Sequence, residues 1–258
     1  MTIEELLNST RSIAASLGRL DFSSRIAYVY NPLEYAWKPY CRYVSLFGAP
    51  PKRVLFFGMN PGPWGMAQTG VPFGEVGTVK EWLGIEEPVS KPLKEHPKRP
   101  VTGFDCPRSE ASGLRLWGLF KERFGTPESF FSDHFIANYC PLLFFDAEGK
   151  NITPDKLIKS DRQELYRLCD EHAAMLIDFF TPEFAVGIGK FTAARLEEAS
   201  SRAGTAGQNT ATGTDPAVGE NRGSPKVCSV LHPSPASPKA NRGWAEQAVK
   251  ELKAAGVW

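Results

Sequence analysis

The sequence predicts an α/β protein of three layers, α/β/α, in which helices cover both faces of a four-stranded parallel sheet. The first observation is a set of four short apolar runs, typical of buried strands, at 54–58, 135–139, 184–189 and 226–231. The second is that segments with helical periodicity separate these runs. The third is the length of 258 residues, which suits one domain, so we expect a single domain over 1–258.

Amphipathic helices are expected before, between and after the strands because apolar residues recur there three or four positions apart. Leu114, Trp117 and Phe120, for example, share one face of the segment that follows Ser109. The expected helices lie at 2–18, after Ser109, at 165–179, at 190–199 and at 244–255.

Residues 200–225 differ from the rest of the chain, because they are rich in Gly, Thr, Ala and Asn and almost without large apolar side chains. This composition predicts a flexible loop between the helix at 190–199 and the fourth strand. A lid over a substrate is the alternative interpretation of the same segment.

Composition bounds the function only weakly. Thirty basic and twenty-nine acidic residues give a net charge of +1, which neither predicts nor excludes a polyanionic partner. No signal peptide and no apolar run of about 20 residues is present, so we expect a soluble, intracellular protein without a membrane partner. The five cysteines are scattered without a C-x-x-C pair, so we expect reduced thiols, no metal and no cofactor; a site shared by His134 and Cys140 is the one metal alternative.

Polar residues follow the predicted strands at their carboxyl ends. Met59 and Asn60 follow the first strand, Asn138 ends the second, Lys190 follows the third and His232 follows the fourth. Because ligands of open parallel sheets bind outside the carboxyl ends of the strands, these residues predict one pocket along that edge.

Each of these residues also has a structural interpretation. Asn60 precedes a proline and could simply begin a turn, and His232 could be a hydrogen-bonded histidine at a strand exit. Asn138 is more informative because an amide in an apolar run needs partners for its donors and acceptors. His172 lies on an apolar helix face and is expected in the core.

Two long motifs carry a resemblance to a known family. "GMNPGPWGMAQTGVPFGEV" (58–76) and "HPSPASPKANRGW" (232–244) resemble the signature motifs of the single-strand-selective monofunctional uracil-DNA glycosylases. "EHPKRPVTGFDCPRSEASGLRLWGLF" and "NYCPLLFFDAEGKNITP" are similar to that family as well. The resemblance runs from about residue 25 to the end of the chain, except at 200–225.

The resemblance implies the uracil-DNA glycosylase fold and hydrolysis of the N-glycosidic bond of uracil and related damaged pyrimidines in DNA. Asn60 resembles the residue that positions the water, and His232 resembles the catalytic histidine. Phe73 resembles the residue that stacks on the base, and Asn138 the one that reads its pairing edge. Met59, Gly62 and Met66 are expected to complete the base pocket.

These side chains suit the chemistry of a flipped-out base. A carboxamide such as Asn138 can accept from the N3–H of uracil and donate to O4, whereas cytosine presents the reversed pattern. His232 could donate to the 2-carbonyl oxygen as negative charge develops there, and a neutral imidazole suffices. Asn60 cannot act as a strong base, but it can orient a water towards the anomeric carbon. No carboxylate is expected at the strand ends, and no lysine nucleophile, so the enzyme should be monofunctional.

The expected partner is uracil-containing DNA, bound by a monomer in the bacterial cytoplasm and nucleoid or in the eukaryotic nucleus. The basic segment 91–100 could form a DNA-binding patch or an ordinary solvated loop. Ser109 and Ser112 could bind a phosphate, although helix capping also explains a serine there. Ala236 stands where relatives often carry a bulky basic residue in the segment pressed into the duplex. The expected DNA contacts are Ser109, Ser112, Lys190, Ser234, Ala236, Ser237 and Arg242.

Two alternatives stay open. The same fold could act mainly on deaminated purines such as xanthine, or the chain could bind damaged or single-stranded DNA without cleaving it. The presence of both Asn60 and His232 argues against the second alternative, because a pure binder needs neither.

Overall fold

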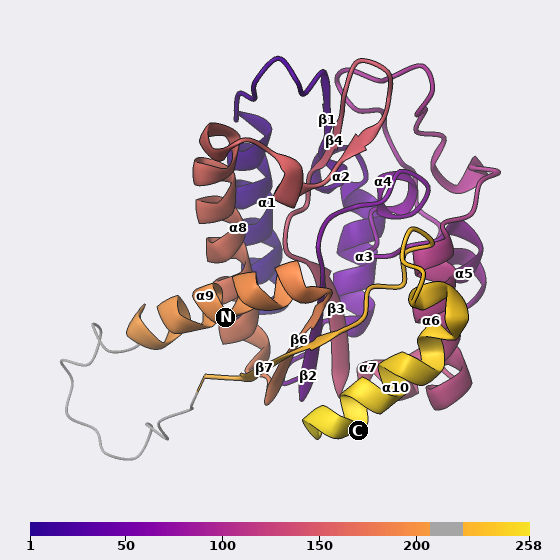
Figure 1. The fold of residues 1–258 in the computed structure, drawn as a ribbon, viewed down its shortest axis with the longest axis vertical. Helices are drawn as coiled ribbons and strands as arrows, with labels where there is room; N and C mark the ends of the chain where they lie inside the picture. Colours follow the sequence, from indigo (N-terminus) through magenta and orange to yellow (C-terminus); the bar gives the residue numbers. More distant parts are fainter. Residues whose placement is uncertain (207–223) are drawn as a thin grey trace.

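A four-stranded parallel sheet lies at the centre of the computed structural model, which describes residues 1–206 and 224–258 (Figure 1). The strand order is β3-β2-β6-β7, and the predicted fold class is confirmed. The strands are β2 (Val54–Gly58), β3 (His134–Asn138), β6 (Phe184–Ile188) and β7 (Lys226–Val230), each within one residue of the predicted run.

The register brings the carboxyl ends of the strands to one edge of the sheet. Gly58 pairs with Asn138, and Ile188 pairs with Val230. The pairing continues past the strand ends, because the N–H of Cys140 donates to the carbonyl of Met59 over 2.9 Å. The residues that follow the strands are therefore held by the sheet itself.

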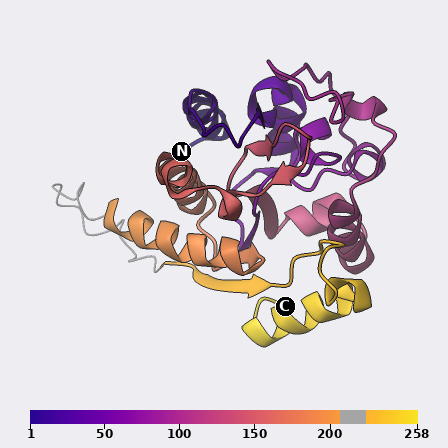
Figure 2. The same cartoon turned by 45° about the horizontal axis from the view of Figure 1, so that its top comes forward.

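Helices form a layer on each face of the sheet (Figures 1 and 2). On one side α9 packs on β6 and β7, α8 packs on α9, and α1 packs on α8; on the other, α10 contacts β7 and α6. The predicted helices are found as α1 (Ile3–Gly18), α6 (Ala111–Phe124), α8 (Lys159–Phe180), α9 (Lys190–Ala206) and α10 (Trp244–Ala255). The remaining helices are α2 (Pro32–Tyr35), α3 (Trp37–Phe47), α4 (Met66–Thr69), α5 (Val76–Glu81) and α7 (Pro127–Phe131), with 3₁₀ turns η1 (Gly103–Asp105), η2 (Pro154–Lys156) and η3 (Ala240–Arg242).

The helix α9 is longer than predicted. It continues to Ala206, so the first residues of the expected loop at 200–225 are helical. Residues 207–223 of that expected loop lie outside the described residues. The sequence reading missed this extension because the segment has few large apolar residues to mark a helical face.

A buried polar network joins α8, α9 and the end of β3. Tyr139 donates to the Asp170 carboxylate over 2.8 Å, and Arg195 donates to both Tyr139 (3.0 Å) and Asp170 (2.5 Å). Asp170 is almost fully buried, so its charge requires these partners. The network fixes the helices against the sheet next to the edge that carries the site.

A second, antiparallel sheet was not predicted. It consists of β1 (Tyr28–Tyr30), β4 (Leu143–Phe145) and β5 (Asn151–Ile152) in the order β1-β4-β5. Asp146 turns the β4–β5 hairpin by accepting from the N–H groups of Glu148 and Lys150. This small sheet carries Asn151 and Thr153 to the parallel-strand edge.

His134 is a structural residue and shares nothing with Cys140. Its Nδ1 lies 3.0 Å from the carbonyl of Phe130, and its Nε2 accepts from the indole of Trp258 over 3.3 Å. Both ring nitrogens therefore have protein partners, which leaves none for a metal. Separately, the part of the chain that the structure describes contains no helix of the length and apolarity that crossing a membrane requires.

Candidate active site

A cleft of about 680 Å³ opens at the carboxyl ends of the parallel strands. Segments distant in sequence form it: the loop after β2, the start of α6, the end of β3, residues 151 and 153, and the segment after β7. Of the predicted residues it contains Met59, Asn60, Gly62, Phe73, Asn138 and His232, together with Ser109, Ser112, Ser234, Ala236 and Ser237. The sequence thus identified most of the lining.

Three predicted residues do not line this cleft. Met66 is buried behind Asn138, whose amide Nδ2 lies 3.1 Å from the Met66 sulfur. Lys190 and Arg242 line a neighbouring cleft. Met66 therefore supports the wall of the site from behind.

Phe73 is held in an unusual backbone conformation. Its φ is 54°, a left-handed value that is costly for an aromatic residue. The carbonyl of Phe73 accepts from the indole of Trp117 over 3.2 Å, and a Cβ at Gly113 would collide with that same carbonyl. These neighbours fix the backbone of Phe73, whose ring centroid lies 6.1 Å from that of the His232 ring.

Asn60 has its amide nitrogen fully engaged. Nδ2 donates to the carbonyl of Leu142 (3.2 Å) and to that of Pro61 (3.3 Å). The amide orientation is therefore set, and Oδ1 is the atom left to accept a hydrogen bond at the cleft. A half-buried carbonyl oxygen in this position can hold a water. The turn interpretation of Asn60 is only part of its role, because the second carbonyl comes from a different segment.

His232 is a neutral imidazole with a defined tautomer. Burial lowers its pKa from 6.5 to about 4. The N–H of Ser234 donates to Nδ1 over 3.1 Å, so the single ring proton lies on Nε2. The side chain that lines the cleft is thus an uncharged hydrogen-bond donor.

Asn138 and Gly58 form the floor between these groups. Asn138 is 5% exposed, and within the described residues its Oδ1 has no hydrogen-bond partner. A Cβ at Gly58 would lie 2.5 Å from the ring of Phe73 and even closer to Asn138 Oδ1. Only glycine allows the amide and the aromatic ring to approach the strand end together. An unpaired buried carbonyl oxygen needs a partner, which a ligand with an N–H would supply.

Glu110 is the residue that the sequence analysis missed, and the expectation of no carboxylate at the strand ends is wrong. Its carboxylate accepts from the N–H of Trp64 over 3.3 Å, and a Cβ at Gly62 or Gly65 would collide with it. Burial raises the pKa of Glu110 to about 7, with a further rise from Glu75, while hydrogen bonds from the Trp64 and Gly65 N–H groups lower it. Glu110 therefore braces the glycine-rich loop.

The one trace of Glu110 in the sequence is the pair of glycines, Gly62 and Gly65, that leave space for its carboxylate. Gly62 and Gly65 look like generic turn residues in the sequence, and nothing local connects them with Glu110, which lies far along the chain. The same holds for Asn151 and Thr153, which reach the cleft through the unpredicted hairpin.

The amino end of α6 borders the cleft. The N-cap residue is Glu110, whose side chain makes no capping hydrogen bond, so the capping interpretation of Ser109 is wrong. Ser109 is exposed and Ser112 is nearly buried, and both line the cleft. The free N–H groups of a 14-residue helix favour an anion here.

The segment after His232 is braced by hydrogen bonds and exposed at its tip. Arg115 donates to the carbonyl of Pro233 (3.0 Å) and to Asn241 (2.9 Å), and Asn241 donates to the carbonyl of Pro235 (2.8 Å). Ala236, at the tip, is exposed. A short braced loop with a small apolar residue thus projects beside the cleft.

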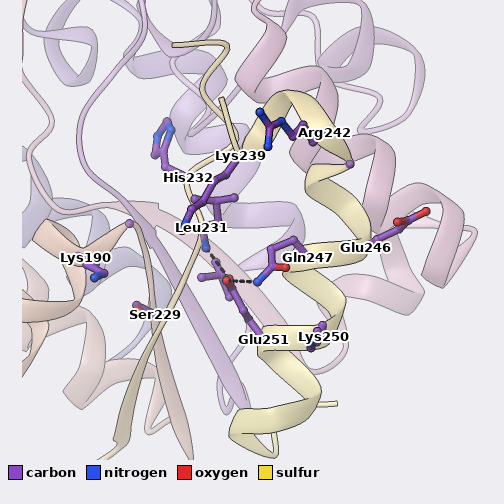
Figure 3. A pocket seen from close by; sticks show the side chains of 13 residues that line it. Lys190, Ser229, Leu231, His232, Lys239, Arg242, Glu246, Gln247, Lys250 and Glu251 are labelled. Atoms are coloured by element: carbon purple, nitrogen blue, oxygen red, sulfur yellow. Dashed lines mark hydrogen bonds between the residues drawn. The ribbon is translucent and has the colours of Figure 1, made fainter. Parts of the chain in front are cut away.

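A second cleft, of about 780 Å³, lies between the start of α9, the end of β7 and α10 (Figure 3). Lys190, Lys239, Arg242 and Lys250 contribute its basic side chains. Glu251 is turned inward, where it accepts from the N–H of Leu231 over 2.7 Å and from Gln247 over 2.6 Å. His232 lines both clefts, so the basic groove continues directly from the first one.

The basic segment 91–100 is mostly occupied with structural contacts. Lys91 bonds to Glu95 (3.4 Å), and Lys94 donates to the carbonyl of Ala27 (3.0 Å). Arg99 donates to the carbonyl of Gly149 (2.8 Å) and also lies over the Trp64 ring. These contacts favour the interpretation as an ordinary structured loop over that of a DNA-binding patch.

Comparisons with known proteins agree on one family. The family described as "UDG: Uracil DNA glycosylase superfamily" matches residues 46–253. Single-strand selective monofunctional uracil DNA glycosylases of Mus musculus and Rattus norvegicus are 42% and 43% identical over 254 residues, covering 98% of this chain and 85% of theirs. The protein of that name from Bos taurus is 42% identical, with 98% and 87% covered. The crystal structure of wild-type Pedobacter heparinus SMUG2 shares the fold, with a TM-score of 0.62, 17% identity, and 97% and 98% of the two chains covered.

Proposed function

The chain belongs to the single-strand selective monofunctional branch of the uracil DNA glycosylase superfamily, and we propose that Asn60 and His232 are its catalytic residues. The resemblance of the two motifs is confirmed, and the protein is a DNA-repair glycosylase that removes uracil from DNA. The observation that carries our assignment is that Asn60, Phe73, Asn138 and His232 line one cleft.

Uracil recognition rests on Phe73 and Asn138. The Phe73 ring supplies a stacking surface for the flat base. The unpaired Oδ1 of Asn138 accepts the N3–H of uracil, and Nδ2 donates to O4. Cytosine would oppose donor to donor and acceptor to acceptor, at a cost of about 1–3 kcal/mol for each buried group left unpaired. Met59 and Gly62 complete the pocket wall from the loop after β2.

His232 stabilises the departing base. As the glycosidic bond breaks, its electron pair moves onto the base, and negative charge collects on the 2-carbonyl oxygen. The proton on Nε2 is available to that oxygen because Nδ1 already accepts from Ser234. The imidazole is neutral near pH 7, so it donates a hydrogen bond without giving up a proton.

Asn60 positions the water that attacks the sugar. The amide is oriented by two backbone carbonyls, so Oδ1 can accept from a water beside the anomeric carbon. The sugar carries positive charge in the transition state, so the water needs orientation more than deprotonation. Its proton leaves to solvent after attack, and the products are free uracil and an abasic site. No chain nucleophile takes part in this scheme, in keeping with a monofunctional enzyme.

DNA runs across both clefts in our proposal. Ser109 and Ser112, at the amino end of α6, bind the phosphate beside the flipped nucleotide. Lys190 and Arg242 follow the strand into the basic groove. Ser234, Ala236 and Ser237 occupy the space that the base has left, and the small Ala236 makes a weak wedge. Uracil should therefore be released from single strands at least as fast as from duplexes. These groups all lie on one surface of a single chain. We therefore propose that the protein acts as a monomer, in a compartment that contains DNA.

The experiment is single-turnover release of free uracil from matched single- and double-stranded oligonucleotides that contain one uracil. Xanthine- and hypoxanthine-containing strands of the same sequence test substrate class. Asn60→Ala and His232→Ala should slow uracil release by orders of magnitude. If the protein bound these strands yet released no uracil over hours, the assignment of Asn60 and His232 as catalytic residues would be overturned. Faster release of the purines would overturn uracil as the main substrate.

A further inference from the structure

A small cavity of about 10 Å³ lies behind the base-reading amide, distinct from the cleft in front of it. Asn138 contributes to both spaces. The other polar side chains in its wall are those of His172 on α8 and Tyr40 on α3, and Met66 lies beside them. A volume of about 10–15 Å³ on this measure is what a single water molecule occupies.

His172 is buried, and its ring nitrogens lack hydrogen-bond partners in the part of the chain that the structure describes. It is 3% exposed, and no hydrogen-bond partner of either ring nitrogen occurs among the described residues. Burial lowers its pKa to about 4, so near pH 7 the ring is neutral and has one donor and one acceptor nitrogen. Leaving both unpaired costs free energy, which an apolar side chain of similar size would avoid. The expectation that His172 is an ordinary core residue does not account for this cost.

The amide nitrogen of Asn138 lacks a strong hydrogen-bond acceptor among the described residues. Its Nδ2 faces only the Met66 sulfur, 3.1 Å away, and a thioether is a weak acceptor. The orientation of this amide decides which base is read, because a half-turn about its last torsion exchanges the acceptor and the donor. The turned amide matches cytosine instead of uracil. A specific enzyme therefore needs more than the sulfur to hold the amide.

We propose that one water molecule in this cavity accepts from Asn138 Nδ2 and donates to His172, which makes His172 the positioning residue of the uracil-reading amide. This inference rests on the proposed role of Asn138. The N–H that faces the Met66 sulfur is shared with the water, so the second N–H of Nδ2 stays free for O4 of the base. His172 never touches the substrate, and it acts only through the orientation of Asn138.

Three variants test the relay by single-turnover uracil release. His172→Leu removes both ring nitrogens and should slow release about fivefold to tenfold, the effect of one hydrogen bond. His172→Gln keeps a polar group of similar reach and should restore most of the rate. Leu176→Val, one turn further along α8 and equally buried, is the control for core disturbance and should keep the wild-type rate.

The decisive comparison is made in the Asn138→Ala background, where the residual rate is followed over hours. If His172 acts through the amide, adding His172→Leu there changes nothing further. An equal slowing in both backgrounds, or no slowing of the wild type by His172→Leu, would overturn the relay. A crystal structure with a dry cavity would overturn it too. If Asn138→Ala itself released uracil at the full rate, the proposed base reading would fail, which is a distinguishable result.

Discussion

Gly58 offers the sharpest perturbation of the site, because its lack of a side chain lets the two groups that we propose as uracil contacts approach the strand end. In Gly58→Ala, the added methyl would lie 2.5 Å from the Phe73 ring and closer still to Asn138 Oδ1. Ordinary van der Waals contact begins at 3.4 Å, so the ring and the amide must retreat by about 1 Å. The backbone of Gly58 has ordinary strand geometry and accepts alanine, so the strain falls on the two side chains.

The expected cost in rate is large and the cost in stability moderate. A misplacement of about 1 Å in a positioned group can slow a reaction about 10²-fold. Overpacking of this kind destabilises a protein by about 1–3 kcal/mol, which leaves a folded chain. Single-turnover uracil release at saturating enzyme measures the first quantity, and thermal unfolding measures the second.

Gly118→Ala is the matched control. Gly118 lies on α6 with no atom within 4 Å of an added Cβ, so this variant should keep the wild-type rate and unfold at a slightly higher temperature. A folded Gly58→Ala protein that releases uracil at the wild-type rate would refute the close approach of Phe73 and Asn138 as the basis of the pocket.

Three further predictions concern pH and DNA binding. The folded-state pKa values of His134, His172 and His232 are lowered from 6.5 to about 4, so the unfolded chain binds more protons below pH 6.5. Stability is therefore lost as pH falls from 6.5 towards 4, by about 3 kcal/mol for a fully buried histidine. Calorimetry should find that the unfolding temperature of His172→Leu falls less over this pH range than that of the wild type. Parallel curves of unfolding temperature against pH would contradict this. Glu110 behaves in the opposite sense, since a pKa raised to about 7 costs stability as pH rises from 4.5 to 7. Glu110→Gln should thus increase the free energy of unfolding at pH 8 by about 1 kcal/mol, seen as a higher unfolding temperature, and should lose that gain at pH 4.5. An equal gain at both pH values would show that the charge is irrelevant. Finally, Lys190→Ala and Arg242→Ala should each reduce the magnitude of the negative slope of log binding constant against log salt concentration by about 1 on single-stranded DNA. Lys38→Ala, on α3 outside the basic groove, should leave that slope unchanged.

The parallel sheet was predictable because its four strands are short and mostly apolar, and a chemically distinctive residue ends or follows each of them. Asn60, Asn138 and His232 could be placed at one edge since the carboxyl ends of parallel strands converge there. The roles of these residues came from the resemblance of two motifs, and no pattern in the chain supplied them.

Glu110, Asn151 and His172 could not be assigned because their roles depend on packing between distant segments. Glu110 meets Gly62 only after α6 docks against the loop that follows β2. Asn151 depends on a hairpin only two residues long on one side. His172 looked like core on its helical face, and only the packed structure shows that its ring nitrogens have no partner within the described residues and that it shares a cavity with Asn138.

The most direct test of the account is the effect of His232→Ala on uracil release and on DNA binding in the same single-stranded oligonucleotide. Removing a donor to a developing oxyanion should slow release about 10²- to 10³-fold, while the dissociation constant for DNA stays within about twofold. Uracil release at the wild-type rate would contradict the assignment of His232 as the residue that stabilises the departing base.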